Sequence, residues 1–80
     1  MSTMRAKFVV ENVEKSETGE RVYFRAVGKS SAYPEDGSDE DNSFAKFTPS
    51  AELSIFIANP ALFGQFEPGQ KFYADFSPAD

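Results

Sequence analysis

The sequence predicts a β-rich domain, all-β or α+β in class, that forms a small antiparallel barrel or sandwich with one short helix before the last strand. Three observations predict it. Apolar and polar residues alternate in several short segments, which is the period of a strand. Nine Phe and three Tyr among 80 residues suit a pleated surface. Gly- and Pro-containing turns separate the segments, as in small barrels and sandwiches.

The first two strands are predicted to form a hairpin. "AKFVVENV" (6–13) is rich in β-branched and aromatic residues without a helical repeat, and "ERVYFRAVGK" (20–29) alternates apolar and polar residues. Between them, "SETG" (16–19) is a turn sequence in which Gly19 is suited to a positive φ. Two such runs joined by a short Gly-containing loop are typical of a hairpin.

The pairing register of this hairpin stays open at this point. Pairing Lys15 with Glu20 would bring Glu14 opposite Arg21, which joins two opposite charges. A slip of one residue would move every side chain to the other face of the sheet.

The segment 44–58 is predicted to be a bent strand, or two strands divided near Pro49. Proline cannot donate a hydrogen bond and therefore interrupts strand pairing. Beyond it, Leu53, Ile55 and Ile57 alternate with other residues, as expected of a strand with one buried face.

The last third of the chain predicts a short helix, a turn and a final strand. Asn59 is a favoured N-cap and Pro60 a favoured first helical residue, so we expect the helix at about residues 60–66. "EPGQ" (67–70) has the Pro-Gly centre of a type II turn. "KFYADF" (71–76) alternates again and is the predicted last strand.

We expect residues 1–80 to form one domain with a flexible acidic loop at 30–43. The loop contains "PEDGSDEDN" (34–42), in which five of nine residues are acidic. Those five are Glu35, Asp36, Asp39, Glu40 and Asp41. A metal site, an imitation of a nucleic-acid backbone and a solvated loop are three interpretations of this stretch.

The calcium-loop interpretation fails at two diagnostic positions. A calcium loop that began at Asp36 would need Gly at its sixth position and an acid at its twelfth, and these positions hold Asp41 and Phe47. An imitation of phosphates would need rigidly ordered carboxylates, whereas Ser, Gly and Asn surround these. We therefore predict a solvated loop that keeps an aromatic protein in solution.

Composition argues against an enzyme and against a cofactor. The chain has no His, the commonest general base, and no Cys for a thiol nucleophile, a disulfide or a zinc site. Its five glycines do not cluster into a phosphate-binding loop. The net charge of −5 disfavours double-stranded DNA and anionic membranes. No segment resembles a membrane span or a secretory signal, so we expect neither.

Exposed cations and aromatic rings provide one candidate binding face. The candidate residues are Arg21, Tyr23, Arg25, Phe56 and Tyr73. The first three alternate along one strand, a pattern with which proteins bind single-stranded nucleic acids by stacking and charge. The alternative is a charge ladder across the hairpin with Glu11 or Glu14.

The second half of the chain resembles a family of small proteins encoded by tailed bacteriophages. The matching segment is "NSFAKFTPSAELSIFIANPALFGQFEPGQKFYADFSPA" (42–79), in which "KFTP", "NP", "FEPG" and "DFSPA" carry the similarity. The opening "MRAKF", from Met4, is also similar. The resemblance implies a viral origin, and the family brings no established activity with it.

From these observations we predict a small non-enzymatic bacteriophage protein that acts by protein–protein binding. Its partner would be a host factor, a defence system or the virion, so we expect it in the host cytoplasm during infection or in the particle. The alternative is a small-barrel module that binds nucleotides or single-stranded nucleic acid through Arg21, Tyr23 and Arg25. The number of aromatic rings also predicts a homodimer or small homo-oligomer, because a core of this size encloses only part of them.

Overall fold

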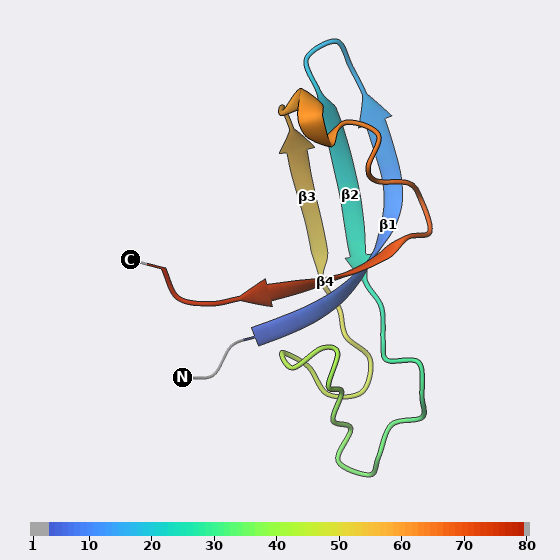
Figure 1. Ribbon diagram of the computed structural model, residues 1–80. Helices are drawn as coiled ribbons and strands as arrows, with labels where there is room; N and C mark the ends of the chain where they lie inside the picture. Colours follow the sequence, from blue (N-terminus) through green and yellow to red (C-terminus); the bar gives the residue numbers. More distant parts are fainter. Residues whose placement is uncertain (1–3, 80) are drawn as a thin grey trace.

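The computed structural model describes residues 4–79, which form one four-stranded antiparallel sheet in the order β3-β2-β1-β4 (Figure 1). The elements are β1 (Met4–Lys15), β2 (Glu20–Ala26), β3 (Glu52–Ile57), the short helix η1 (Pro60–Leu62) and β4 (Lys71–Phe76). The β-rich class with one short helix before the last strand is confirmed. Within the described residues the sheet is not closed into a barrel, because β3 and β4 are its two edges.

Strand β1 is shared by the two halves of the sheet. Its residues 8–15 pair with β2, and its residues 4–9 pair with β4. The register shifts between Val10 and Asn12, so that β1 carries a bulge where the two halves meet. A bulge bends the strand that carries it, and β4 accordingly crosses the direction of β2 and β3 in Figure 1.

The hairpin is confirmed, and its register is the one that joins opposite charges. Lys15 pairs with Glu20, and Glu14 pairs with Arg21. The expected positive φ at Gly19 is wrong, because the residues with positive φ lie elsewhere. A Cβ atom at Gly19 would instead collide with the ring and backbone of the neighbouring β3, so this glycine permits a close approach.

The predicted helix and third strand are both shorter than expected. Asn59 caps η1 as predicted, with its side chain accepting a hydrogen bond from Ala61 N at 3.1 Å. The helix ends because Phe63 is extended and Gly64 has φ 79°. The extended third strand is confirmed for 52–57 only, and residues 44–51 are not strand because Phe47 has a positive φ and a proline follows.

The two faces of the sheet differ sharply, and we call them the inner and the outer face. The inner face holds the buried core, which consists of Ala6, Phe8, Val10, Val22, Phe24 and Ile57. The segment 58–70 passes over part of this face, and the Phe66 ring lies 6.0 Å from the Phe24 ring and 5.1 Å from the Phe72 ring. The outer face carries most of the charged side chains of the strands, from Arg5 and Lys7 to Asp75.

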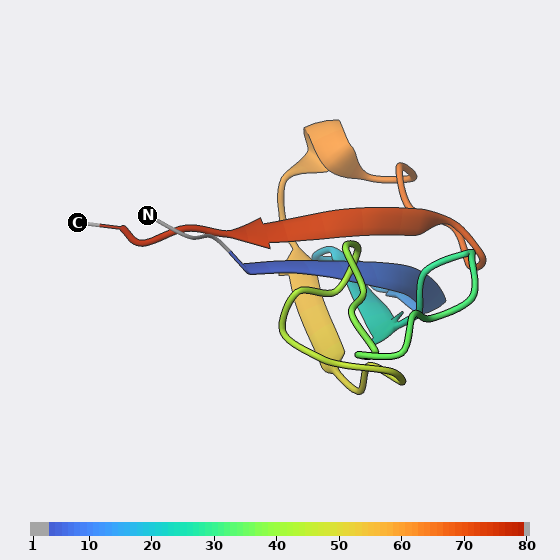
Figure 2. The ribbon, with the colours of Figure 1, turned by 90° about the horizontal axis from the view of Figure 1, so that it is seen from below.

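The molecule is thin for its mass. Its Cα atoms extend over 48 × 33 × 16 Å, and the sheet with its covering segment is seen from below in Figure 2. The Cα radius of gyration is 14.4 Å, against about 12 Å for a compact domain of this length. Across residues 4–79 no helix has the length and apolar character to cross a bilayer.

Candidate protein-binding face

An apolar groove opens on the inner face between the two edge strands. It has a volume of about 250 Å³ and lies between β3 and β4. The side chains that form it include Phe8, Phe24, Leu53, Ile55, Phe66 and Phe72. The sequence predicted that Leu53 and Ile55 share the buried face of their strand, whereas the structure leaves Ile55 exposed.

Strand pairing explains why these side chains meet. Leu53 pairs with Phe24, and Phe72 pairs with Phe8, so the antiparallel ladders place all four on one face. The Phe24 and Phe72 rings are arranged edge to face with centroids 6.4 Å apart. Phe8 and Phe24 are buried and form the floor of the groove, whereas Phe72 and Ile55 are 37% and 45% exposed.

The apolar surface continues beyond the groove. A second recess of about 150 Å³ shares Phe8 and Leu53 with the groove and extends to Phe44, Met4 and Phe76. Met4 and Phe76 are 42% and 46% exposed. We call the groove and this recess together the apolar strip. A continuous exposed apolar surface of this kind marks an interaction site more often than an accident of packing.

The apolar strip contains little charge: among the residues that line its groove and its recess, Glu52 at the start of β3 is the charged one. The charged side chains on the inner face of the hairpin are Lys15 and Glu20, which lie at the hairpin end and away from β4. Glu20 is 5% exposed; its Oε1 accepts a hydrogen bond from Gly64 N at 2.9 Å, and its Oε2 has no hydrogen-bond partner. A partner that covered the strip would therefore remove mainly apolar side chains from water and few charged groups.

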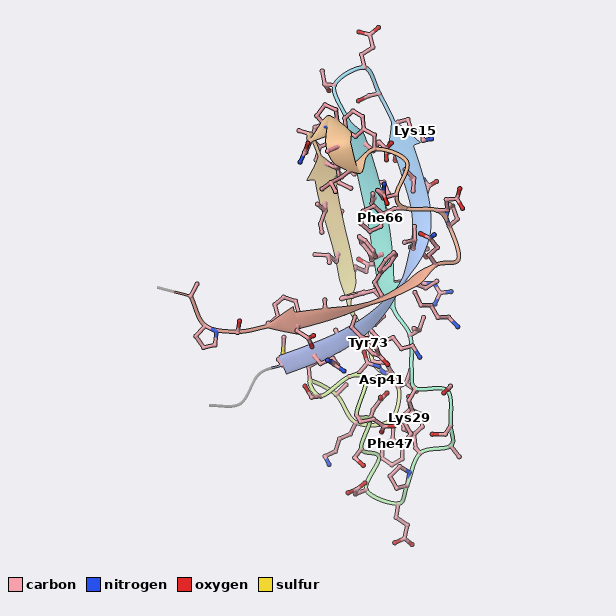
Figure 3. The ribbon with its side chains drawn as sticks, in the orientation of Figure 1. Lys15, Lys29, Asp41, Phe47, Phe66 and Tyr73 are labelled. Atoms are coloured by element: carbon pink, nitrogen blue, oxygen red, sulfur yellow. The ribbon has the colours of Figure 1, made fainter. Side chains whose placement is uncertain are left out.

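Four of the five candidate residues predicted from the sequence lie on the outer face, away from the groove, whereas Tyr73 also borders the groove. Arg21, Tyr23 and Arg25 occupy successive outward positions of β2, and Phe56 pairs with Arg21 across β3. The Arg21 guanidinium lies 5.4 Å from the centroid of the Phe56 ring. The structure thus brings four of the five candidates together. Tyr73 is separate from them, on β4 beyond β1 (Figure 3).

One of the two arginines of β2 is already engaged by a carboxylate. Arg25 Nε lies 3.4 Å from Glu11 Oε2. A hydrogen bond with Glu14 raises the pKa of the Tyr23 hydroxyl above its usual value, and partial desolvation adds to the effect. These contacts correspond to the charge-ladder interpretation of the pattern.

Tyr73 belongs to a separate polar cluster on the outer face. The Arg5 guanidinium lies 4.5 Å from the centroid of its ring, and its hydroxyl donates to Asp41 Oδ1 at 2.9 Å. The hydrogen bond with Asp41 raises the pKa of Tyr73. Lys7 Nζ lies 3.3 Å from Asp41 Oδ2, so the acidic loop reaches β1 and β4 here, as the labelled Tyr73 and Asp41 in Figure 3 show.

The prediction of a solvated acidic loop is wrong for Asp39. Its side chain is 4% exposed and accepts hydrogen bonds from the backbone N–H groups of Lys29, Asp41 and Asn42 and from the Asn42 side chain. Burial alone raises the pKa of Asp39, but the hydrogen bonds from Asn42 and the backbone outweigh burial and hold the pKa below its usual value.

Asn42 fastens the same loop to the sheet. It is fully buried, and its Oδ1 accepts from Lys7 N at 2.8 Å while its Nδ2 donates to Val27 O at 2.7 Å. Ser43 adds two bonds to Arg5, through N and Oγ. These residues form hydrogen bonds with backbone groups of β1 beyond the point where β2 has ended. The loop therefore has a packing role.

Asp41, held by Lys7 and Tyr73, also departs from the solvated interpretation, whereas the remaining acidic side chains of the loop fit it. Asp36 is exposed and accepts a hydrogen bond from Ser38 N at 3.0 Å, which lowers the pKa of its carboxyl group. Glu40 pairs with Lys29 at 3.1 Å and is largely exposed, as is Glu35. Among residues 4–79, no three acidic side chains gather in a way that could hold a metal ion.

Comparison with protein-family models, with curated proteins and with solved structures gives no match to this chain. The functional argument therefore depends on the residues themselves. Sequence reasoning predicted Phe72 and Ile55 as strand residues and missed them as site residues. The composition already indicated that some apolar side chains stay exposed, because twelve aromatic rings exceed what one small layer encloses.

Proposed function

We propose that this protein acts by binding another protein, and that the contact is the apolar strip on the inner face. The observation that supports this most strongly is the groove between β3 and β4, whose rims carry the accessible side chains of Ile55 and Phe72. Aromatic and aliphatic side chains that stand at the centre of an uncharged surface are typical anchors of protein interfaces.

The same groove is a poor site for a small polar ligand or a reaction. Binding pockets for small molecules combine apolar walls with a few polar groups that fix the ligand's orientation, and the walls here are formed mainly by Phe, Leu and Ile side chains. Single-stranded nucleic acid is disfavoured as well, because Arg25 is paired with Glu11 and the net charge is −5.

The resemblance to small proteins of tailed bacteriophages defines where the partner would be found. Under this proposal the chain binds a host factor, a defence protein or a component of the virion. Mass spectrometry of purified particles and of infected lysate separates these cases: a virion component stays with the particles, whereas a protein aimed at the host remains in the lysate.

A matched pair of substitutions on one strand tests the binding face. Ile55→Asp places a charge on the groove rim, whereas Ser54→Asp places the same charge one residue away on the outer face. We expect partners captured from the host by the wild-type chain to be lost with Ile55→Asp and kept with Ser54→Asp. Equal capture by both variants would refute the inner face as the contact.

A further inference from the structure

We propose that the occupant of the apolar strip is a second copy of this chain, placed face to face about a two-fold axis so that two sheets form a sandwich. The inference rests on the proposed function, because it concerns the same face: the second copy covers the strip until the heterologous partner displaces it. Three properties of the molecule support it: its single layer, its surface area and the placement of its charges.

The single layer is incomplete as a domain. Stable domains bury the apolar face of a sheet against a second layer of structure. Here the segment 58–70 covers part of the inner face with Phe63 and Phe66, and the strip beside it stays open. A second sheet packed at about 10 Å would cover it, and another copy carries such a sheet.

The surface area fits a dimer of ordinary size. The chain exposes 5628 Å², whereas a compact monomer of 8.9 kDa exposes about 4800 Å². The difference of roughly 800 Å² is what one partner buries in a standard protein interface. The long loop contributes to this excess. The inner face contributes exposed apolar side chains, namely Met4, Ile55, Phe72 and Phe76.

A two-fold axis requires the strip to be complementary to itself, and its shape allows this. In such an interface the same surface serves both copies, so a rim residue of one can enter the groove of the other and the reverse holds. Phe72 and Ile55 are the rim side chains, and the groove of about 250 Å³ is of side-chain size. Within residues 4–79 the strand register places no charged side chain in the middle of the inner face, and Glu52, which borders the recess, alternates to the outer face.

The charges make this dimer distinguishable from a complex with a basic protein. Each copy has a net charge of −5 and carries five acidic side chains in the loop 34–42, so two copies repel at long range. Salt screens this repulsion: the Debye length falls from about 30 Å at 0.01 M to about 8 Å at 0.15 M. Self-association should therefore become about tenfold tighter over that range, whereas binding to a basic protein would weaken.

Sedimentation equilibrium of the full chain tests the proposal. We expect twice the 8.9 kDa mass of one chain at roughly 100 μM, with the stated salt dependence. Ile55→Asp should sediment as a monomer and Ser54→Asp as a dimer, with circular dichroism showing that both variants remain folded. Since Ile55 is 45% exposed, the monomer should retain its fold.

Two results would overturn the proposal. One is a wild-type chain that remains monomeric at roughly 100 μM and in high salt. The other is a dimer that Ile55→Asp leaves intact. If the wild-type chain is monomeric but Ile55→Asp still abolishes capture of a host protein, the second copy is refuted and the proposed function stands. If Ile55→Asp changes neither measurement, both are refuted.

Discussion

Asn42 offers the sharpest test of how the acidic loop is held. Its side chain is fully buried and bridges Lys7 N and Val27 O, at 2.8 and 2.7 Å. Replacing it with Ala leaves one backbone donor and one backbone acceptor unpaired at a site where the structure admits little water. Each such group costs about 1–3 kcal/mol, so we expect Asn42→Ala to lower the free energy of unfolding by about 3 kcal/mol.

That loss is large for a domain of this size. Eighty residues typically give about 4–12 kcal/mol in total, so the urea midpoint should fall by a large fraction. Asp36→Ala is the control, since its exposed carboxylate accepts only the local bond from Ser38 N and should cost under about 1 kcal/mol. Urea unfolding followed by circular dichroism at one fixed protein concentration measures both. Equal, small losses for the two variants would refute the anchoring role of Asn42.

Three further substitutions test separate features. Asp39 has a lower pKa in the folded than in the unfolded chain. Its contribution to stability is therefore complete above about pH 4 and is lost as the pH falls through the folded pKa. Urea midpoints measured down to about pH 2 should fall less for Asp39→Asn than for the wild-type chain. Glu20→Gln keeps an acceptor for Gly64 N and removes a buried carboxylate whose second oxygen has no partner. We therefore expect thermal unfolding to show that the free energy of unfolding rises by about 1 kcal/mol. A clear loss of stability would contradict this. Gly19→Ala should lose about 2 kcal/mol, because the new methyl group meets the backbone of Ile57; an unchanged melting temperature would show that β3 can move aside.

Much of the sheet could be predicted because it depends on local sequence. The bounds of β4, the hairpin and the cap at Asn59 all follow from alternation and turn residues that lie within a few positions of one another. The register became certain only in the structure, where the pairing of Glu14 with Arg21 is one of two that the sequence allowed.

The loop could not be predicted because its anchors depend on distant residues. Asp39 and Asn42 look like members of a polar run, and their burial depends on Lys7 and Val27, which lie 35 and 15 residues from Asn42. Charge patterning identifies the run and gives no information about which members turn inward.

The proposed binding face was missed for a related reason. Alternation predicted that Phe72 and Ile55 point inward, and an inward residue is normally covered. Whether a second layer covers it depends on the path of the segment 58–70, which folds over one part of the face and leaves the other open. The alternation of Arg21, Tyr23 and Arg25, by contrast, can be read directly from the sequence, because it depends on charge and aromatic character alone.

The most direct test of the central claim is a dilution series of the wild-type chain followed by side-chain methyl NMR. If the inner face is the contact surface between two copies, the methyl signals of Ile55 and Leu53 should shift on dilution. Those of Val9, which is buried on the opposite face under the outer side chains, should stay in place. Shifts at Val9 with Ile55 and Leu53 unchanged, or no shift at any of the three, would contradict the account.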